Sequence, residues 1–200
     1  MNPHNSTTAL DPQASPQHAP QRATENPQAD WQADLARAGG PAALWREQSL
    51  WALRVYRYGR WVDAQRPGWA RRWRTRWYWV CFRLVETLTG ISLPKEAQVG
   101  PGLRIWHFGG VFINPATRIG AGCTLRQGVT LGNRAEGGPS PVLEDGVDLG
   151  AYAQVLGGVR LGAGCKVGAM AVVLRDVPPG ATAVGNPARL IAAPASKPTE

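Results

Sequence analysis

The stretch RIGAGCTLRQGVTLG, residues 118–132, places a large aliphatic side chain at every sixth position, at Ile119, Leu125 and Leu131. This interval fits neither the turn of an α-helix nor the simple alternation of a β-sheet. It fits a solenoid with triangular coils, in which each side is six residues long and contributes one inward aliphatic side chain. The sequence therefore predicts a mainly β fold, a parallel β-helix built from hexapeptide repeats.

The same interval extends to both sides of this stretch. A glycine follows many of the aliphatic residues, and a small or β-branched residue that fits the narrow interior lies two positions before most of them. The aliphatic positions are Val99, Ile105, Ile113, Ile119, Leu125, Leu131, Leu149, Val155, Leu161, Val167 and Val173, and the small positions are Thr117, Cys123, Val129, Val147, Ala153, Val159, Cys165 and Ala171.

Two interruptions divide the repeats. Between Ile105 and Ile113 the step is eight residues, and the two extra residues lie in HFGG, where glycines permit a sharp turn or a bulge. Between Leu131 and Leu149 the eighteen residues equal one coil in length, but GNRAEGGPSP lacks the inward pattern. This second segment predicts a loop that leaves the coil and overhangs a neighbouring surface.

Upstream of the repeats the composition changes twice. The leading segment is rich in Pro, Ala, Gln, Asn, Ser and Thr and has few large apolar residues, which predicts a disordered tail. The next segment has apolar residues at helical spacing. The expected organisation is a disordered tail over 1–40, a basic, tryptophan-rich helical region over 41–92, a β-helix domain over 93–192 and a C-terminal tail over 193–200.

Two helices are expected in the helical region, over 41–65 and over 70–90, separated by the break RPGW. In the first helix, the spacing predicts one apolar face, formed by Leu44, Trp51, Val55 and Tyr58.

Composition limits the class of protein. The 200 residues are 44% hydrophobic and contain three cysteines, Cys81, Cys123 and Cys165, without CxxC spacing. They fit neither a disulfide framework nor a zinc site, so reduced, structural thiols and no metal are expected. No apolar run of about 18 residues and no secretory signal pattern occurs, so a cytoplasmic protein is expected.

The net charge of +8 is concentrated in residues 41–90, where ten arginines accompany three acidic residues. Three interpretations of this region stay open. It could be a structural cap that also contacts other subunits, or residues 45–83 could attach peripherally to an anionic membrane, such as the inner membrane face. Nucleic-acid binding is disfavoured, because no RNA- or DNA-binding motif accompanies the charge.

One histidine can serve acid-base chemistry in the folded part. The chain has three histidines, and two of them, His4 and His18, lie in the predicted tail. The third, His107, lies on the two-residue interruption, between a tryptophan and glycines. It is the candidate general base near neutral pH.

The motifs of the coil resemble a known family. GVTLGN, the Gly-rich loop and the closing DVPPGATAVGNPARLI, within residues 88–192, resemble the serine O-acetyltransferase family of left-handed β-helix acyltransferases. GISLP and GLRIWHFGGVFINP look like those members that are associated with exopolysaccharide synthesis. The resemblance implies a homotrimer that binds acetyl-CoA in a groove between subunits, with His107 as catalytic base.

The resemblance also implies which residues line the cofactor groove. Small residues would admit the pantetheine arm, and cations would bind the phosphates. The residues at the family's positions are Gly132, Asn133, Ala151, Lys166, Ala169 and Arg189.

Three positions depart from the serine-specific pattern. Trp106 occupies the place of an aspartate directly before the histidine, Ser92 that of the aspartate that orients the imidazole, and Ser140 that of a substrate-binding histidine. All three changes remove polar or charged groups, so the amino and carboxylate groups of free serine would lose partners, whereas Trp106 offers a stacking surface for a sugar. The acceptor is therefore expected to be a saccharide hydroxyl or, as the family default, L-serine. A non-catalytic β-helix scaffold is the alternative.

Overall fold

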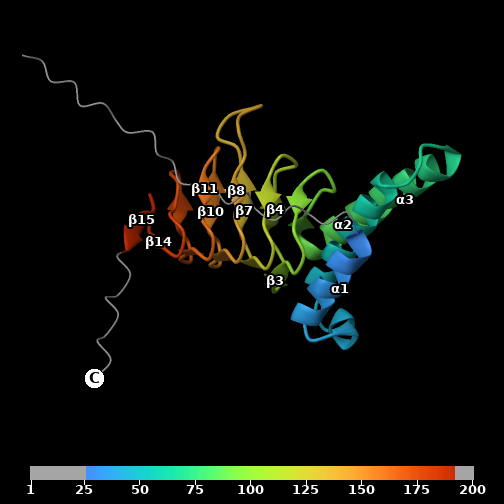
Figure 1. The fold of residues 1–200 in the computed structure, drawn as a ribbon, viewed down its shortest axis with the longest axis horizontal. Coiled ribbons are helices and arrows are strands. Elements are labelled where there is room, and N and C mark those ends of the chain that lie inside the picture. Colours follow the sequence, from blue (N-terminus) through green and yellow to red (C-terminus); the bar gives the residue numbers. More distant parts are fainter. Residues whose placement is uncertain (1–25, 192–200) are drawn as a thin grey trace, which may run out of the picture.

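The computed structural model describes residues 26–191, in which a helical region precedes a parallel β-helix (Figure 1). The coil has three sheets, and its strands pair in parallel, except β14 with β15. The first sheet contains β1 (Ile91–Ser92), β4 (Val111–Ile113), β7 (Thr130–Gly132), β10 (Gln154–Leu156) and β13 (Val172–Val173). The second contains β2 (Gln98–Val99), β5 (Arg118–Ile119), β8 (Val142–Leu143) and β11 (Arg160–Leu161). The third contains β3 (Arg104–Trp106), β6 (Thr124–Arg126), β9 (Asp148–Leu149), β12 (Lys166–Val167), β14 (Thr182–Val184) and β15 (Arg189–Ile191).

The six-residue period is confirmed as the origin of the core. Every predicted aliphatic position and every predicted small position is buried. Equivalent residues of successive coils stack in register, as Leu131 does on Val155 and Val155 on Val173. Each stacked pair removes apolar surface from water, which is the main stabilising contribution to a solenoid.

The structure corrects the prediction for the second interruption. Leu131 stacks on Val155, not on Leu149, so the segment between Leu131 and Leu149 is less than one coil. The step from Leu131 to Leu143 is twelve residues because the loop after β7 adds six, and six is the repeat length, so the phase survives. This loop projects from the coil between β7 and β8 (Figure 1).

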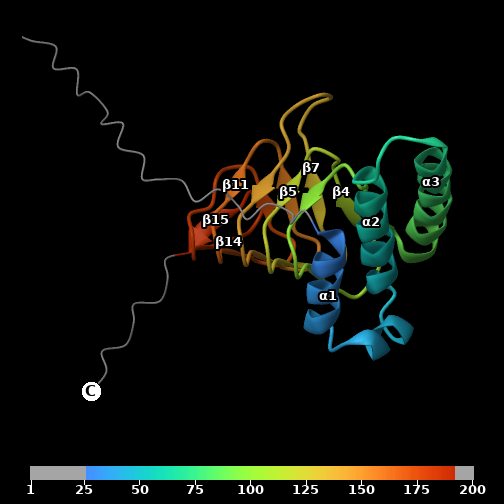
Figure 2. The ribbon, with the colours of Figure 1, turned by 45° about the vertical axis from the view of Figure 1, so that its right-hand side comes forward.

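Four helical elements lie at the first coil of the β-helix. They are α1 (Pro27–Arg37), the 3-10 helix η1 (Pro41–Trp45), α2 (Ser49–Asp63) and α3 (Trp69–Thr89). In Figure 2, α2 lies between α1 and α3. The Tyr56 hydroxyl of α2 donates to the carbonyl oxygen of Ala97 over 2.8 Å and accepts from the Val99 amide over 3.1 Å, so α2 satisfies backbone groups at the exposed end of the coil.

The predicted tail over 1–40 was wrong for its last part. Asn26 caps a helix that begins at Pro27, and its side chain accepts from the amides of Gln28 and Ala29. This helix buries Trp31 and Leu35, although its composition is mostly polar. Residues 1–25 of the predicted tail, with His4 and His18, lie outside the described residues, as does the predicted C-terminal tail over 193–200.

Buried ion pairs explain why the polar sequence of α1 folds. The Arg57 guanidinium of α2 donates to Asp34 over 2.8 and 3.1 Å and to Asp30 over 3.2 Å. It also donates to the carbonyl oxygens of Val99 and Gly100 in the first coil. Every N–H of this guanidinium therefore has a partner, and α1, α2 and the coil are joined at one buried point.

The predicted face of the first helix was also wrong. Trp51 is exposed, and Leu44 lies in η1 rather than in α2. The buried face is instead formed by Leu50, Leu53, Tyr56 and Arg57. The pattern could not show this, because an arginine is expected to be exposed unless buried acids pair with it. The second predicted helix is confirmed as α3.

Candidate active site

His107 lies at the edge where the chain passes from the third sheet to the first. We call it the His107 edge. Its successive turns stack Gly110, Gly128, Tyr152 and Met170, and His107 lies in the longer first turn. His107, Tyr152 and Met170 have φ angles of 66°, 60° and 59°, and they are the residues other than glycine with positive φ among residues 26–191. Each residue other than glycine in this left-handed backbone conformation destabilises the folded state by on the order of 1 kcal/mol.

The neighbouring edge of the coil uses glycine in its left-handed turn positions. Where the chain passes from the second sheet to the third, each left-handed position is a glycine. These glycines are Gly102, Gly122, Gly146, Gly164 and Gly180. Large side chains in the same conformation on the His107 edge are therefore not required by the coil, and such strain is typical of functional sites.

The predicted turn at HFGG is confirmed, and its glycines have a structural reason. Gly109 and Gly110 both have positive φ, of 101° and 67°. The turn approaches Gly90 closely, since a Cβ on Gly90 would lie 3.1 Å from the Gly109 Cα. The Val111 amide donates to the Gly90 carbonyl oxygen at the same place. The turn is thus held against the end of α3 and the start of the coil.

Trp106 and Arg104 stack beside the histidine. The Arg104 guanidinium carbon lies 4.2 Å from the centre of the Trp106 ring, so one face of the indole is covered. The same guanidinium donates twice to Glu47, which comes from the segment between η1 and α2. Trp106 is therefore held as a half-exposed ring next to the imidazole.

Glu47 is the site residue that the sequence did not reveal. The Arg104 guanidinium holds the pKa of this carboxyl below its ordinary value, and the positive charge of Arg46 adds to the effect. Nothing in the local sequence marks this glutamate. It reaches the site only because the helical region packs on the first coil.

Ser92, at the position of the orienting aspartate, lies in β1, whose residue Ile91 pairs with Val111 directly after the HFGG turn. Ser92 pairs in register with Phe112 and makes no hydrogen bond to His107. Within residues 26–191, the His107 imidazole has no hydrogen-bond partner. The imidazole is exposed. A second molecule or a substrate can therefore reach its nitrogen atoms.

Exposed apolar side chains surround this edge. Each exposes 45% or more of its surface, which is unusual for so many large apolar residues along one line of a monomer. They are Trp106, Phe108, Phe112, Tyr152 and Met170. Such a line indicates a surface that another molecule covers.

The residues expected to bind the cofactor fall into two groups. Ala151 and Ala169 lie on the His107 edge, where the Met170 amide donates to the Ala151 carbonyl oxygen over 2.8 Å. Lys166 lies on the outer side of the third sheet, and Arg189 lies in β15 at the end of that sheet. Lys166 is three coils beyond β3, about 14 Å along the axis. The structure therefore orders these four residues from the histidine toward the end of the coil.

Gly132, Asn133 and Ser140 lie elsewhere, at the edge between the first and second sheets. Asn114 links the two ends of the loop there, because its amide donates to the Asn133 side-chain oxygen over 3.4 Å and its oxygen accepts from the Ser140 hydroxyl over 3.0 Å. Within a single chain, this group and His107 therefore lie on opposite sides of the first sheet.

Arg134, in the same loop, has a structural role. Its guanidinium donates to the carbonyl oxygen of Leu156 over 3.1 Å and to that of Leu174. The loop is thereby attached to the next two coils. Arg134 is consequently not a free charge for a substrate.

The buried thiols are poor nucleophiles. Burial raises the pKa of Cys123 and of Cys165 to about 12, so both stay protonated near neutral pH. Both occupy inward positions, as predicted. Across residues 26–191, no three His, Cys, Asp or Glu side chains are grouped as metal ligands would be.

Comparisons with known proteins agree on one family. No family model matches the chain. A serine acetyltransferase of Synechococcus elongatus is 35% identical over 163 residues, which make up 80% of this chain and 64% of that protein. A Helicobacter pylori serine acetyltransferase is 42% identical over 111 residues, or 65% of its length, so the chain spans slightly less than two thirds of these curated relatives.

Solved structures extend the match. The Brucella abortus serine acetyltransferase in complex with coenzyme A has a TM-score of 0.67 and 25% identity, with 82% of this chain and 66% of that chain covered. Soybean serine acetyltransferase complexed with serine has a TM-score of 0.70 and 31% identity, and the match covers 82% of this chain and 69% of the soybean chain. The same parallel β-helix and this degree of identity show that the chain belongs to the serine acetyltransferase family.

Proposed function

We propose that the protein is an acetyl-CoA-dependent O-acetyltransferase with His107 as its general base. The observation that carries this proposal is the backbone of His107, held in a left-handed conformation on an edge that could have used glycine. Its family relatives are named serine acetyltransferases, and one of them was solved with coenzyme A.

The proposed chemistry needs one titrating side chain. The His107 imidazole accepts the proton of an acceptor hydroxyl while that oxygen attacks the thioester carbonyl carbon. The carbon–sulfur bond breaks, the imidazolium returns the proton to the departing sulfur, and an acetyl ester and a free thiol are formed. Backbone N–H groups would stabilise the developing oxyanion.

The proposed donor site fits small residues and cations on this chain. Ala151 and Ala169 leave room for a narrow arm along the His107 edge, and Lys166 and Arg189 offer exposed cations further along the coil for phosphates. Tight stacking of the coils explains the small residue next to Ala151, since a Cβ on Gly150 would lie 2.5 Å from the Ala169 nitrogen. The alanines themselves face solvent at least in part, so their size is available to a ligand.

We further propose that the complete site forms between subunits of a homotrimer. Gly132, Asn133 and Ser140 of one chain would face His107 of the next, because no single chain brings them together. Closed cyclic symmetry would also cover the apolar side chains of the His107 edge.

Light scattering tests the assembly. We expect the mass of three chains in solution, and dilution to subunits should abolish turnover, because each site needs two chains. A monomer that retains full turnover would contradict a shared site.

For the acceptor, we propose a saccharide hydroxyl, as in polysaccharide biosynthesis, in preference to L-serine. Trp106 cannot pair an ammonium as an aspartate can, and its ring, covered on one face by Arg104, leaves the other face for a sugar. The names of the relatives, and the serine in the soybean structure, favour L-serine instead. A desolvated charge without a partner costs several kcal/mol, which is the reason for our preference.

The ratio of kcat/KM for saccharides to that for L-serine tests the acceptor. Thiol release from acetyl-CoA would be followed with L-serine and with a panel of saccharides and lipid-linked sugars. We expect higher kcat/KM with a saccharide, and Trp106→Asp should move the ratio toward serine. Efficient acetylation of serine with no reaction of any sugar would overturn this choice of acceptor. If acetyl-CoA neither reacts nor raises the melting temperature, the protein is a scaffold rather than an enzyme.

Acetyl-CoA is a cytoplasmic metabolite, so we place the reaction in the cytoplasm. A membrane-bound or lipid-linked acceptor would make attachment to the inner membrane face useful. The helical region offers the surface for it.

A further inference from the structure

One face of α3 is apolar and exposed along its whole length. Six large side chains on it expose between 57% and 78% of their surface. Their spacing of four, four, three, four and four residues places them on one side of the helix. They are Trp69, Trp73, Trp77, Val80, Leu84 and Leu88, and we call them the α3 stripe.

The α3 stripe points away from the rest of the chain. The opposite side of α3 buries Tyr78, Phe82 and Thr89, and α3 packs against α2. In Figure 2, α3 is the outermost of the three long helices, at the end of the molecule away from the later coils. No described residue covers the stripe.

Arginines accompany the stripe. Arg72, Arg76 and Arg83 lie along one flank, and the Arg76 guanidinium carbon is 5.3 Å from the centre of the Trp73 ring. Arg83 pairs with Glu86, which is the single acidic residue of α3 beside five arginines. The helix therefore combines a wide apolar face with a strongly positive border.

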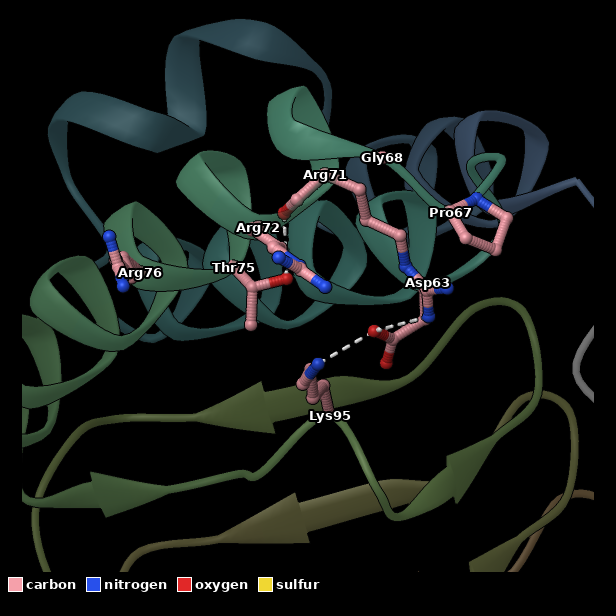
Figure 3. A pocket seen from close by; sticks show the side chains of 8 residues that line it. All are labelled: Asp63, Pro67, Gly68, Arg71, Arg72, Thr75, Arg76 and Lys95. Carbon is pink, nitrogen blue, oxygen red and sulfur yellow. Dashed lines mark hydrogen bonds and ion pairs between the residues drawn. The ribbon is translucent and has the colours of Figure 1, made fainter.

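A basic pocket lies at the N-terminal end of the same helix (Figure 3). It has a volume of about 520 Å³, and its lining includes Arg71, Arg72, Arg76 and Lys95 with one acidic residue, Asp63. Asp63 pairs with Lys95 over 2.6 Å and with Arg71 over 3.6 Å. Arg72 and Arg76 have no acidic partner in the described part of the chain, so the pocket carries net positive charge next to the first tryptophan of the stripe.

We propose that α3 binds the surface of an anionic phospholipid bilayer. The tryptophans and aliphatic residues of the stripe enter the boundary between headgroups and acyl chains, with the helix axis in the membrane plane. Arg72, Arg76 and Arg83, on the flank of the stripe, contact lipid phosphates. No helix among residues 26–191 is long and apolar enough to cross a membrane, so contact with one surface is the mode that α3 can support.

Two other occupants fit the α3 stripe less well. A second copy of the chain docked antiparallel through this stripe would bring its own row of arginines against the first row, and the oligomer mass tests a parallel arrangement. Nucleic acid would match the arginines but not Val80, Leu84 and Leu88, which need an apolar environment. An anionic bilayer satisfies both features at once. The proposal is independent of the acetyl transfer.

Co-sedimentation of the full chain with vesicles tests the proposal. We expect binding at low salt to vesicles of phosphatidylcholine with about one third phosphatidylglycerol, much weaker binding to phosphatidylcholine alone, and a decrease as salt rises. Arg72→Gln with Arg76→Gln should weaken the partition coefficient by roughly 30-fold, from about 1 kcal/mol for each charge. Trp73→Ser with Trp77→Ser should weaken it by about tenfold or more.

Matched controls use residues of the same types elsewhere. Trp45→Ser changes a fully exposed tryptophan of η1, and Arg118→Gln with Arg175→Gln removes two exposed charges of the coil. These variants should bind vesicles as the wild type does. Absence of binding to anionic vesicles at low salt, or equal losses in the controls, overturns the proposal.

Oligomer mass without vesicles separates the remaining alternative. If Trp73→Ser with Trp77→Ser lowers the mass in solution, the stripe is a subunit interface, and the membrane proposal fails. Turnover with soluble acceptors should be unchanged in every α3 variant. A protein that binds vesicles but shows no acetyl transfer would refute the proposed function and leave this inference standing.

Discussion

Replacement of His107 should lower kcat by about 10²–10⁴-fold, because a positioned general base typically contributes that much to the rate. His107→Asn is the sharper variant. The φ angle of His107 is 66°, in the left-handed region, and asparagine tolerates that conformation better than alanine does. His107→Asn therefore removes the proton acceptor with little strain in the turn, and His107→Ala removes it with some.

The two variants separate chemistry from folding. Both should keep the rise in melting temperature that acetyl-CoA produces, since Ala151, Ala169, Lys166 and Arg189 remain in place. Circular dichroism should match the wild type. Near-normal turnover in a folded variant would rule out His107 as the base, and loss of the acetyl-CoA shift would indicate damage to the groove instead.

Arg57→Met should be the most destabilising single change in the helical region. It leaves Asp34 and Asp30 buried without their cation, and it removes the partners of the Val99 and Gly100 carbonyl oxygens. Breaking a buried ion pair on one side costs about 3–5 kcal/mol. For a chain of this size, the melting temperature should fall by roughly 6–20 °C.

Arg54→Met is the matched control for this change. Arg54 lies on the same helix, is exposed, and stacks over Trp31 at 5.5 Å without a buried acid. We expect its melting temperature to fall by a few degrees at most. Both variants should be compared at equal chain concentration, because an oligomer unfolds in a concentration-dependent way. An Arg57→Met protein as stable as Arg54→Met would show that the buried cluster does not join helices and coil as described.

The residues around the proposed acceptor site differ in whether the sequence alone could reveal them. Trp106 is visible in the sequence, because it is adjacent to the only histidine in the predicted fold. Glu47 is not, because it lies 60 residues before His107 and reaches the corner only through the pairing with Arg104. Tyr152 and Met170 could have been suspected, since they occupy turns in which a coil would be expected to use glycine.

The sequence by itself determined the β-helix, its inward residues and the position of His107 on an irregular turn. These follow from spacing along the chain, since each coil repeats the same local environment and burial recurs with the repeat. Only the tertiary structure decided the end of the coil. Whether Asp30, Asp34 and Arg57 are buried depends on three segments meeting at one point, and the pairing energy exists only after they meet. The same holds for the α3 stripe: the sequence shows tryptophans at helical spacing, but which side of a helix faces α2 is set by packing, and the uncovered side becomes the surface for a partner.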